Sequence, residues 1–228
     1  MNDADLAWLS ALIYRPLHEF ELRATGRGFH VDYLFDHCGT QAALVYDDES
    51  AAIIFRGTEA SNFVIRDLWS NFTIPWPTTW QGVGRVHSGY RRHLNYVGFK
   101  AMHYAERTSA EKKLYVTGHS LGGAVGTEFA SWYYYENRGR RTPWKLAALV
   151  TFGAPKALDS LAASVIGCPI RRYVVKLDWA PCWPPLPLLG HPPNSKILLD
   201  PLPPYSGVLQ RHDPDGYANS VKKKLEIA

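Results

Sequence analysis

The sequence predicts an α/β fold with a mainly parallel central sheet, helices on both faces and an antiparallel hairpin at one edge. Two observations carry this prediction. In the second half of the 228-residue chain, short apolar strands alternate with helical stretches, which is typical of parallel sheets. In the first half, the apolar segments 41–46 and 51–55 flank the turn sequence Asp47-Asp48-Glu49-Ser50, which predicts a hairpin.

In the first half, apolar residues at helical spacing predict an amphipathic helix over residues 5–14, which Pro16 ends. After the hairpin, large apolar groups at helical spacing predict a short helix with an aromatic face within residues 59–74. A loop around Gly82 and Gly84 then leads into a helix that reaches about residue 107.

The second half reads as strands and helices in turn, each bounded by glycine, proline or aspartate. The strands are expected at residues 114–117, 146–152, 170–177 and 196–199, and the helices at residues 121–135, 159–166 and 214–227. A proline-dense stretch at residues 181–193 is expected to form an ordered, extended loop.

The strand at residues 114–117 meets its helix through Gly118-His119-Ser120-Leu121-Gly122, a G-x-S-x-G pattern. A strand before and a helix after this pattern are the context of a nucleophile elbow. The turn strains the serine backbone, so the serine needs small neighbours such as Gly118 and Gly122. It also places Ser120 at a helix N-terminus, where free N–H groups favour negative charge. A glycine-rich turn that merely holds a serine is the alternative, and the flanking elements favour a nucleophile.

A serine hydroxyl needs a general base, and the base needs a third group to orient it. After an elbow serine, the acid comes first in the chain and the histidine second. His191 lies inside the proline-dense run. His212 precedes Asp213-Pro214, a helix start that would anchor it, so His212 is the expected base.

The acid should lie on a loop that leaves the carboxyl end of a strand. Asp178 follows the strand at residues 170–177 directly and meets this requirement. Asp159 is better explained as a helix cap, and Asp200 lies late, between a short strand and prolines. Asp178 is therefore the expected orienting acid.

Composition places limits on the partners. The chain is 46% hydrophobic and 20% charged, with a net charge of +4 that is too diffuse to indicate nucleic-acid binding. The cysteines Cys38, Cys168 and Cys182 lack metal spacing and are expected to be free thiols. There is no phosphate loop and no paired His or Cys ligand, so neither a cofactor nor a metal is expected.

The acidic N-terminus lacks a positive region, so we expect no secretory signal and a cytoplasmic protein, or export without a cleaved signal. No apolar run is long enough for a transmembrane segment. Residues 1–228 are expected to form a single domain, whose oligomeric state the sequence leaves open.

Together these motifs resemble the class 3 lipase family, which includes the filamentous-fungal triacylglycerol lipases, over nearly the whole chain. The matching motifs are Ile54-Phe55-Arg56-Gly57-Thr58, Val86-His87-Ser88-Gly89-Tyr90, residues 118–123, Thr151-Phe152-Gly153-Ala154-Pro155, Asp178-Trp179-Ala180-Pro181, and His212 with Tyr217. Departures are the short chain, the missing signal and disulfide pattern, Tyr90 and Lys156 where Phe and Arg are common, and the compact spacing from Asp178 to His212.

The resemblance implies an α/β-hydrolase fold with Ser120 as nucleophile, Asp178 as acid and His212 as base. It implies an oxyanion hole made by the backbone N–H groups of Thr58 and Leu121, with the Thr58 hydroxyl assisting. It also makes residues 60–75 a candidate lid that would open onto a lipid surface; an ordinary core-packing helix is the alternative there.

The expected function is hydrolysis of lipid esters, such as acylglycerols, through an acyl-enzyme. Apolar side chains that suit an acyl chain are Trp69, Phe72, Trp76, Trp183, Leu186 and Leu188. Alternatives on the same scaffold are a phospholipase or a short-chain esterase. A catalytically silent lipase-like interaction domain is a different class of function; such domains usually lose a triad member, whereas this chain retains all three.

Overall fold

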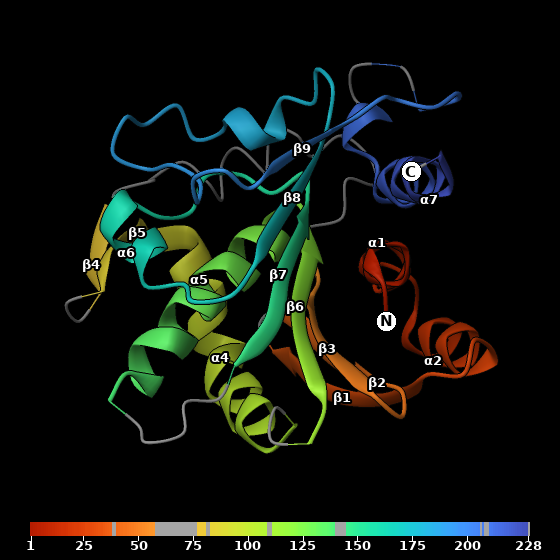
Figure 1. Cartoon of the computed structure of the whole chain (residues 1–228), viewed down its shortest axis with the longest axis horizontal. Coiled ribbons are helices and arrows are strands. Elements are labelled where there is room, and N and C mark those ends of the chain that lie inside the picture. Colours follow the sequence, from red (N-terminus) through yellow and green to blue (C-terminus); the bar gives the residue numbers. More distant parts are fainter. Residues whose placement is uncertain are drawn as a thin grey trace.

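The computed structural model describes residues 1–37, 40–57, 77–80, 83–108, 111–139, 145–205, 207 and 210–227. A seven-stranded sheet runs through the centre in the order β1-β2-β3-β6-β7-β8-β9, and β4 pairs with β5 in a separate ribbon (Figure 1). The strands are β1 (His30–His37), β2 (Thr40–Tyr46), β3 (Ser50–Phe55), β4 (Pro77–Trp80), β5 (Gly84–His87), β6 (Lys113–His119), β7 (Leu146–Phe152), β8 (Ile170–Val175) and β9 (Lys196–Leu199).

Helices cover both faces of this sheet (Figure 1). In the described part of the chain they are α1 (Asp3–Leu12), α2 (Leu17–Gly26), α4 (Ser88–Thr108), α5 (Leu121–Asn137), α6 (Ser160–Ser164) and α7 (Pro214–Ile227), with the short 3-10 turns η1 (Ala180–Cys182) and η2 (Gln210–His212).

The sheet is mixed, and its parallel part is the larger. β1 pairs with β2, and β2 with β3, in antiparallel fashion, whereas β3, β6, β7, β8 and β9 run parallel to one another. The predicted α/β class and edge hairpin are therefore confirmed. Because parallel strands end at the same edge of a sheet, the segments that leave β6 and β8 meet there.

Two apolar layers bury the sheet. Along β3, Ile53 and Phe55 belong to the layer shared with α4 and α5, whereas Ala52 and Ile54 belong to the layer shared with α1 and α7. All four residues are at most 1% exposed. This alternation puts α1, α2 and α7 on one side of the sheet and α4 and α5 on the other (Figure 1).

Helix α1 is also tied to the sheet through polar groups. Arg171 on β8 donates to both carboxylate oxygens of Asp3, at 2.6 and 2.7 Å, and the Tyr173 hydroxyl donates to the same carboxylate at 2.7 Å. A bidentate pair of this kind fixes the orientation as well as the distance. It thereby anchors the start of α1 beside the strand that precedes the predicted acid.

Strand β1, helix α2 and the ribbon of β4 and β5 differ from expectation, because no helix or strand was predicted at their residues. Helix α2 was not predicted, because its apolar residues do not share one face: Phe20 and Ala24 are buried, whereas Leu17 and Leu22 are exposed. The loop expected around Gly84 instead contains strand β5, which pairs with β4 to form a ribbon of two four-residue strands. The candidate lid at residues 60–75 lies outside the described residues.

Candidate active site

The elbow is built from a strand and a helix with one residue between them. β6 ends at His119 and α5 begins at Leu121. Ser120 has φ 56° and ψ −127°, a backbone conformation that side-chain-bearing residues rarely adopt. The Ser120 N–H donates to the Phe152 carbonyl at 2.9 Å, and the Ser120 carbonyl accepts the first helical hydrogen bond of α5 at 3.2 Å.

Close backbone approach explains the glycines on both sides of Ser120. A Cβ on Gly122 would overlap the carbonyl oxygen of Phe55 on β3. A Cβ on Gly118 would stand 2.5 Å from the backbone of Gly122. The prediction that these two neighbours must be small is therefore confirmed in geometric terms.

The structure brings Ser120, His212 and Asp178 together in one hydrogen-bonded chain. The Ser120 hydroxyl lies 2.7 Å from Nε2 of His212, and Nδ1 of the same ring lies 2.9 Å from a carboxylate oxygen of Asp178. Because a carboxylate can only accept, Nδ1 carries the proton and Nε2 is left to accept from the serine. This is the tautomer that a general base for Ser120 requires.

Asp178 is held from several directions. It is 5% exposed, and one carboxylate oxygen accepts from the Ala180 N–H at 3.0 Å. The other oxygen, which faces His212, also accepts from the Tyr217 hydroxyl at 2.5 Å. The carboxylate is thereby paired and oriented before any substrate binds.

Tyr217 closes this network from helix α7. Its hydroxyl accepts from the Val175 N–H at 3.0 Å while it donates to Asp178. Burial, together with the neighbouring Asp178 charge, raises the pKa of Tyr217 well above its ordinary value, so the hydroxyl keeps its proton. Tyr217 therefore connects the end of β8 with the acid that follows it.

His212 is anchored by the start of α7, as predicted. Helix α7 begins at Pro214, and the Asp213 side chain accepts from the Gly216 N–H at 2.8 Å, which is a helix cap. A residue next to a capped helix end has little backbone freedom. The ring of His212 is thus placed by a rigid element rather than by a long loop.

The alternative site residues have other roles. Nε2 of His191 lies 2.7 Å from the Pro181 carbonyl, and burial lowers the pKa of His191 to about 4. Asp159 caps α6 through the Ala162 N–H at 2.8 Å, and Asp200 pairs with Lys176. The interpretation of Asp159 as a helix cap is confirmed, and these three residues take no part in the chain of hydrogen bonds at Ser120.

The structure describes one of the two predicted oxyanion donors, Leu121. Leu121 opens α5, and the N–H groups of a first helical turn have no acceptor within the helix, so its N–H is available beside Ser120. Thr58 lies outside the described residues. Gly57, which precedes it, packs so closely on the elbow that a Cβ there would stand 2.7 Å from the His119 carbonyl oxygen. The oxyanion hole stays a prediction.

The structure describes three of the six side chains that were predicted to suit an acyl chain. Trp69, Phe72 and Trp76 lie outside the described residues. Trp183 and Leu186 are half-buried, and Leu188 is exposed, in the proline-rich segment that follows η1. Their assignment to an acyl site stays a prediction.

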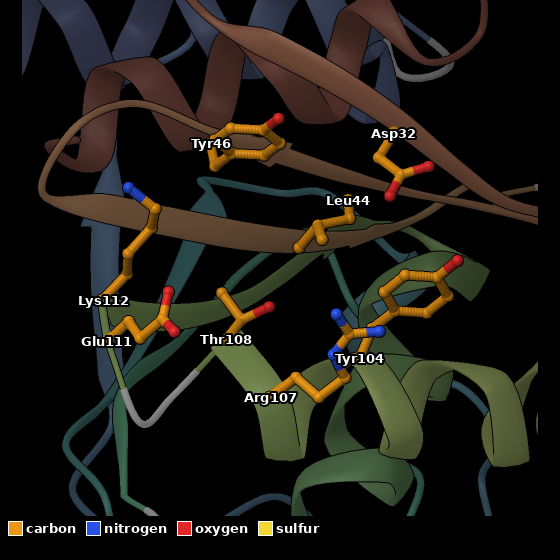
Figure 2. A pocket seen from close by; sticks show the side chains of 8 residues that line it. All are labelled: Asp32, Leu44, Tyr46, Tyr104, Arg107, Thr108, Glu111 and Lys112. Carbon is orange, nitrogen blue, oxygen red and sulfur yellow. The ribbon is translucent and has the colours of Figure 1, made fainter.

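A hollow lies far from this site, at the other end of β6. It is a cavity of about 460 Å³ lined by the side chains shown in Figure 2, which include Arg107 and Thr108 of α4 and Lys112 before β6. A seven-residue strand spans roughly 20 Å, so these side chains cannot contact Ser120.

Metal ligands and membrane-spanning helices would each indicate another class of function for the part of the chain that the structure describes. Among those residues, no three His, Cys, Asp or Glu side chains gather as a metal-ion site would require. None of their helices combines the length and apolar character needed to cross a bilayer. Cys168 and Cys182 are free thiols, as predicted, and Cys38 lies outside the described residues.

Comparison with known proteins agrees with this geometry. A sequence model of the family described as Lipase (class 3) matches residues 52–187, which is more than half of the chain. The chain belongs to the class 3 lipase family. Ser120 and Asp178 fall inside the matched residues of the chain, whereas His212 and Tyr217 fall beyond them.

Individual relatives cover the chain to different extents. Proteins named lipase from Rhizopus niveus and Rhizopus oryzae are each 31% identical to this chain over 139 residues. The aligned stretch covers 58% of this chain, and it spans 34% of the length of each relative.

Similarity to solved structures shows that the chain has the α/β-hydrolase fold. The triacylglyceride lipase of Rhizomucor miehei superposes with a TM-score of 0.70 at 20% identity and covers 95% of both chains. Lipase II from Rhizopus niveus superposes with a TM-score of 0.64 at 21% identity, over 87% of this chain and 78% of that one.

The sequence prediction missed the supporting residues. Tyr217 was singled out only as part of a motif, and nothing in its spacing indicated a bond to Asp178. Tyr14 and His119 also contact each other beside Ser120, at 3.0 Å, although they are 105 positions apart. A tyrosine at the end of an apolar helix gives no signal of such a contact, so only the fold reveals it.

Proposed function

We propose that this class 3 lipase hydrolyses carboxylic esters of lipids through an acyl-enzyme on Ser120. The observation that carries the proposal is the continuous hydrogen-bonded chain from Ser120 through His212 to Asp178, with Ser120 on a strained turn at the start of α5. A hydroxyl with a base at 2.7 Å and a free helix N-terminus behind it is arranged for nucleophilic attack.

In the first half-reaction, the Ser120 hydroxyl oxygen attacks the ester carbonyl while Nε2 of His212 takes the hydroxyl proton. The buried Asp178 carboxylate stabilises the imidazolium that forms and keeps its Nδ1–H in place. His212 then gives its proton to the departing alcohol. The products are a free alcohol and an acyl group bonded to Ser120.

In the second half-reaction, water replaces the alcohol. His212 takes a proton from the water, the resulting hydroxide attacks the acyl carbonyl, and Ser120 leaves with the proton returned by His212. The N–H of Leu121 and the predicted donor Thr58 would stabilise the negative oxygen in both steps. Removal of one such donor from an ester or peptide hydrolase typically slows it by about 100- to 1,000-fold.

Family membership and exposed apolar side chains support a lipid substrate. The matched relatives are named lipases, and one similar structure is a triacylglyceride lipase. Leu177 is 76% exposed immediately before Asp178, and Leu188 is 51% exposed in the proline-rich segment after η1. Large exposed apolar groups on segments that follow β8 would make transient contact with a lipid surface.

The test compares Ser120→Ala with the unchanged protein on emulsified triacylglycerol, phospholipid vesicles and p-nitrophenyl butyrate. The unchanged protein is expected to hydrolyse at least one of these esters, and Ser120→Ala is expected to lose that activity while it keeps the same circular dichroism spectrum. The preferred substrate separates a lipase from a phospholipase or a short-chain esterase. Undiminished turnover by the folded Ser120→Ala protein would refute the proposal.

A further inference from the structure

We propose that Tyr14 is a positioning residue that fixes the oxyanion side of the active site, an inference that rests on the proposed ester-hydrolase function. Tyr14 follows helix α1 and lies outside the residues 52–187 that match the family model. It reaches the two segments that lead to the predicted oxyanion donors, one from β3 and one from β6.

The first contact is with the elbow. The Tyr14 hydroxyl lies 3.0 Å from Nδ1 of His119 and 3.5 Å from the carbonyl oxygen of the same residue. His119 is 3% exposed and directly precedes Ser120, so its ring and backbone are part of the turn itself. Through this contact, α1 supports the elbow from the side opposite helix α5.

The second contact is with the segment that precedes Thr58. Nη2 of Arg56 donates to the Tyr14 carbonyl at 3.3 Å, and its guanidinium lies 5.7 Å from the centre of the Tyr14 ring. Gly57 packs against the Tyr14 hydroxyl so closely that a Cβ at position 57 would overlap it. Tyr14 therefore touches the residue that directly precedes Thr58.

The two segments also touch each other, and Tyr14 lies where they meet. Gly57 approaches the carbonyl of His119, and the Tyr14 hydroxyl is in contact with both residues. Oxyanion donors act through pre-set geometry, because a donor displaced by a fraction of an ångström stabilises the transition state much less. A group that fixes Gly57 and His119 relative to each other would therefore fix the points from which the chain leads to the predicted donors.

His119 is suited to this arrangement because it is neutral. Burial, and then the proximity of His212, lower the pKa of His119 well below its ordinary value. Its ring lies 4.8 Å from that of His212, so a charge on His119 would oppose the imidazolium that forms during attack. The Tyr14 hydroxyl gives the neutral ring a fixed partner without adding charge.

The test is Tyr14→Phe, with Tyr173→Phe as the matched control. The control removes a tyrosine hydroxyl that also serves α1, through its hydrogen bond to Asp3 at 2.7 Å, but that contacts neither Ser120 nor Gly57. Each variant is assayed for kcat and KM on p-nitrophenyl butyrate, for the rate at which an alkyl p-nitrophenyl phosphonate labels Ser120, and for its melting temperature.

Tyr14→Phe is expected to lower kcat and the labelling rate about tenfold, because the predicted oxyanion donors are then held less well in place for the transition state, while KM stays within about twofold. Tyr173→Phe is expected to keep both rates, whatever it does to the melting temperature. If Tyr14→Phe keeps both rates, or if both variants lose activity in step with their melting temperatures, the positioning role is wrong.

The phosphonate separates this inference from the proposed function. If the unchanged protein is labelled at Ser120 but hydrolyses no ester, the proposed function fails, and the labelling rates still decide the role of Tyr14. If Ser120 is neither acylated nor labelled, both proposals fail.

Discussion

At the scale of single residues, the most informative side chain beyond the triad is Tyr217. It is 1% exposed, donates to Asp178 and accepts from the Val175 N–H. One hydroxyl therefore satisfies a buried backbone donor and orients the predicted acid. Its removal would affect both the stability of the protein and its chemistry.

Tyr217→Phe is expected to lower the free energy of unfolding by about 1–3 kcal/mol, because the buried Val175 N–H loses its acceptor. It is also expected to lower kcat, because Asp178 loses one of the donors that hold it toward His212. Urea unfolding and steady-state kinetics would measure the two effects. Tyr205→Phe, on the segment before α7, is the control and should change neither; an unchanged kcat in Tyr217→Phe would contradict the orienting role.

Glu128 presents a different case, a carboxyl group buried where no catalytic step uses it. It lies on α5 with no exposed surface, and both of its carboxyl oxygens are buried. Burial raises the pKa of Glu128 well above its ordinary value, and the charge of Arg91 offsets part of that effect. The folded protein therefore holds Glu128 in its neutral form.

This burial makes stability depend on pH in one direction. As pH rises above the ordinary value of 4.5, the unfolded carboxyl loses its proton while the folded one keeps it, so the free energy of unfolding falls. Glu128→Gln is expected to remove this fall and to stabilise the protein by about 1–3 kcal/mol at pH 8. Thermal unfolding at pH 5 and pH 8 measures the stability change caused by Glu128→Gln, with Glu136→Gln at an exposed position as the control. Equal effects of Glu128→Gln at both values would contradict the account.

At the scale of elements, the proline-rich segment after β8 is ordered by interior contacts rather than by regular structure. His191 in this segment lies 2.7 Å from the Pro181 carbonyl, and the Ser195 hydroxyl donates to the Pro192 carbonyl at 2.6 Å. Burial lowers the pKa of His191 to about 4, which keeps it neutral near pH 7. The segment therefore depends on an uncharged histidine.

Acid should destabilise this segment. Between pH 6.5 and pH 4 the unfolded histidine is protonated and the folded one is not, so the free energy of unfolding falls as pH falls. The loss attributable to His191 is about 3 kcal/mol over this range, and His191→Gln should abolish that share. Urea unfolding at several pH values tests this, with the exposed His103→Gln as control. A profile unchanged by His191→Gln would show that another group causes the acid loss.

Most elements were predictable from the sequence because their signals are local. The strand, glycine and helix around Ser120, the Asp159 cap and the Pro214 helix start each follow from neighbouring residues. Helix α2 and the ribbon of β4 and β5 were not predictable. α2 buries only Phe20 and Ala24, and β4 and β5 contain no apolar run such as Ile197-Leu198-Leu199 of the predicted strand β9.

At the scale of the whole molecule, topology assembles the site from segments far apart in the chain. β6 and β8 run parallel on either side of β7, so Ser120 and Asp178 emerge at the same edge of the sheet. Helix α7 packs beside α1 (Figure 1). His212, just before α7, thereby lies between Ser120 and Asp178. Chain order, a strand end and a helix start predicted these three residues as partners, and the structure places their side chains in hydrogen-bond contact.

The side chains that hold these three residues in place could not be predicted from the sequence, because they come from segments far apart in the chain. The contacts of Tyr14 with His119, and of Tyr217 with Asp178, join positions 105 and 39 residues apart. Such contacts depend on how helices α1 and α7 pack against the sheet, and no local pattern encodes a single hydroxyl bond. The fold determines them, and they are the features that variants can test most sharply.

The central claim is that Ser120 carries the acyl group during ester hydrolysis. The most direct test is to mix the protein with excess p-nitrophenyl butyrate, quench within milliseconds in acid, and measure the intact mass and the modified peptide. The account predicts a burst of p-nitrophenol and a butyryl group on the peptide that contains Ser120, both absent in Ser120→Ala. Turnover without any acylated Ser120 under these conditions, or an acyl group on another residue of the active protein, would contradict it.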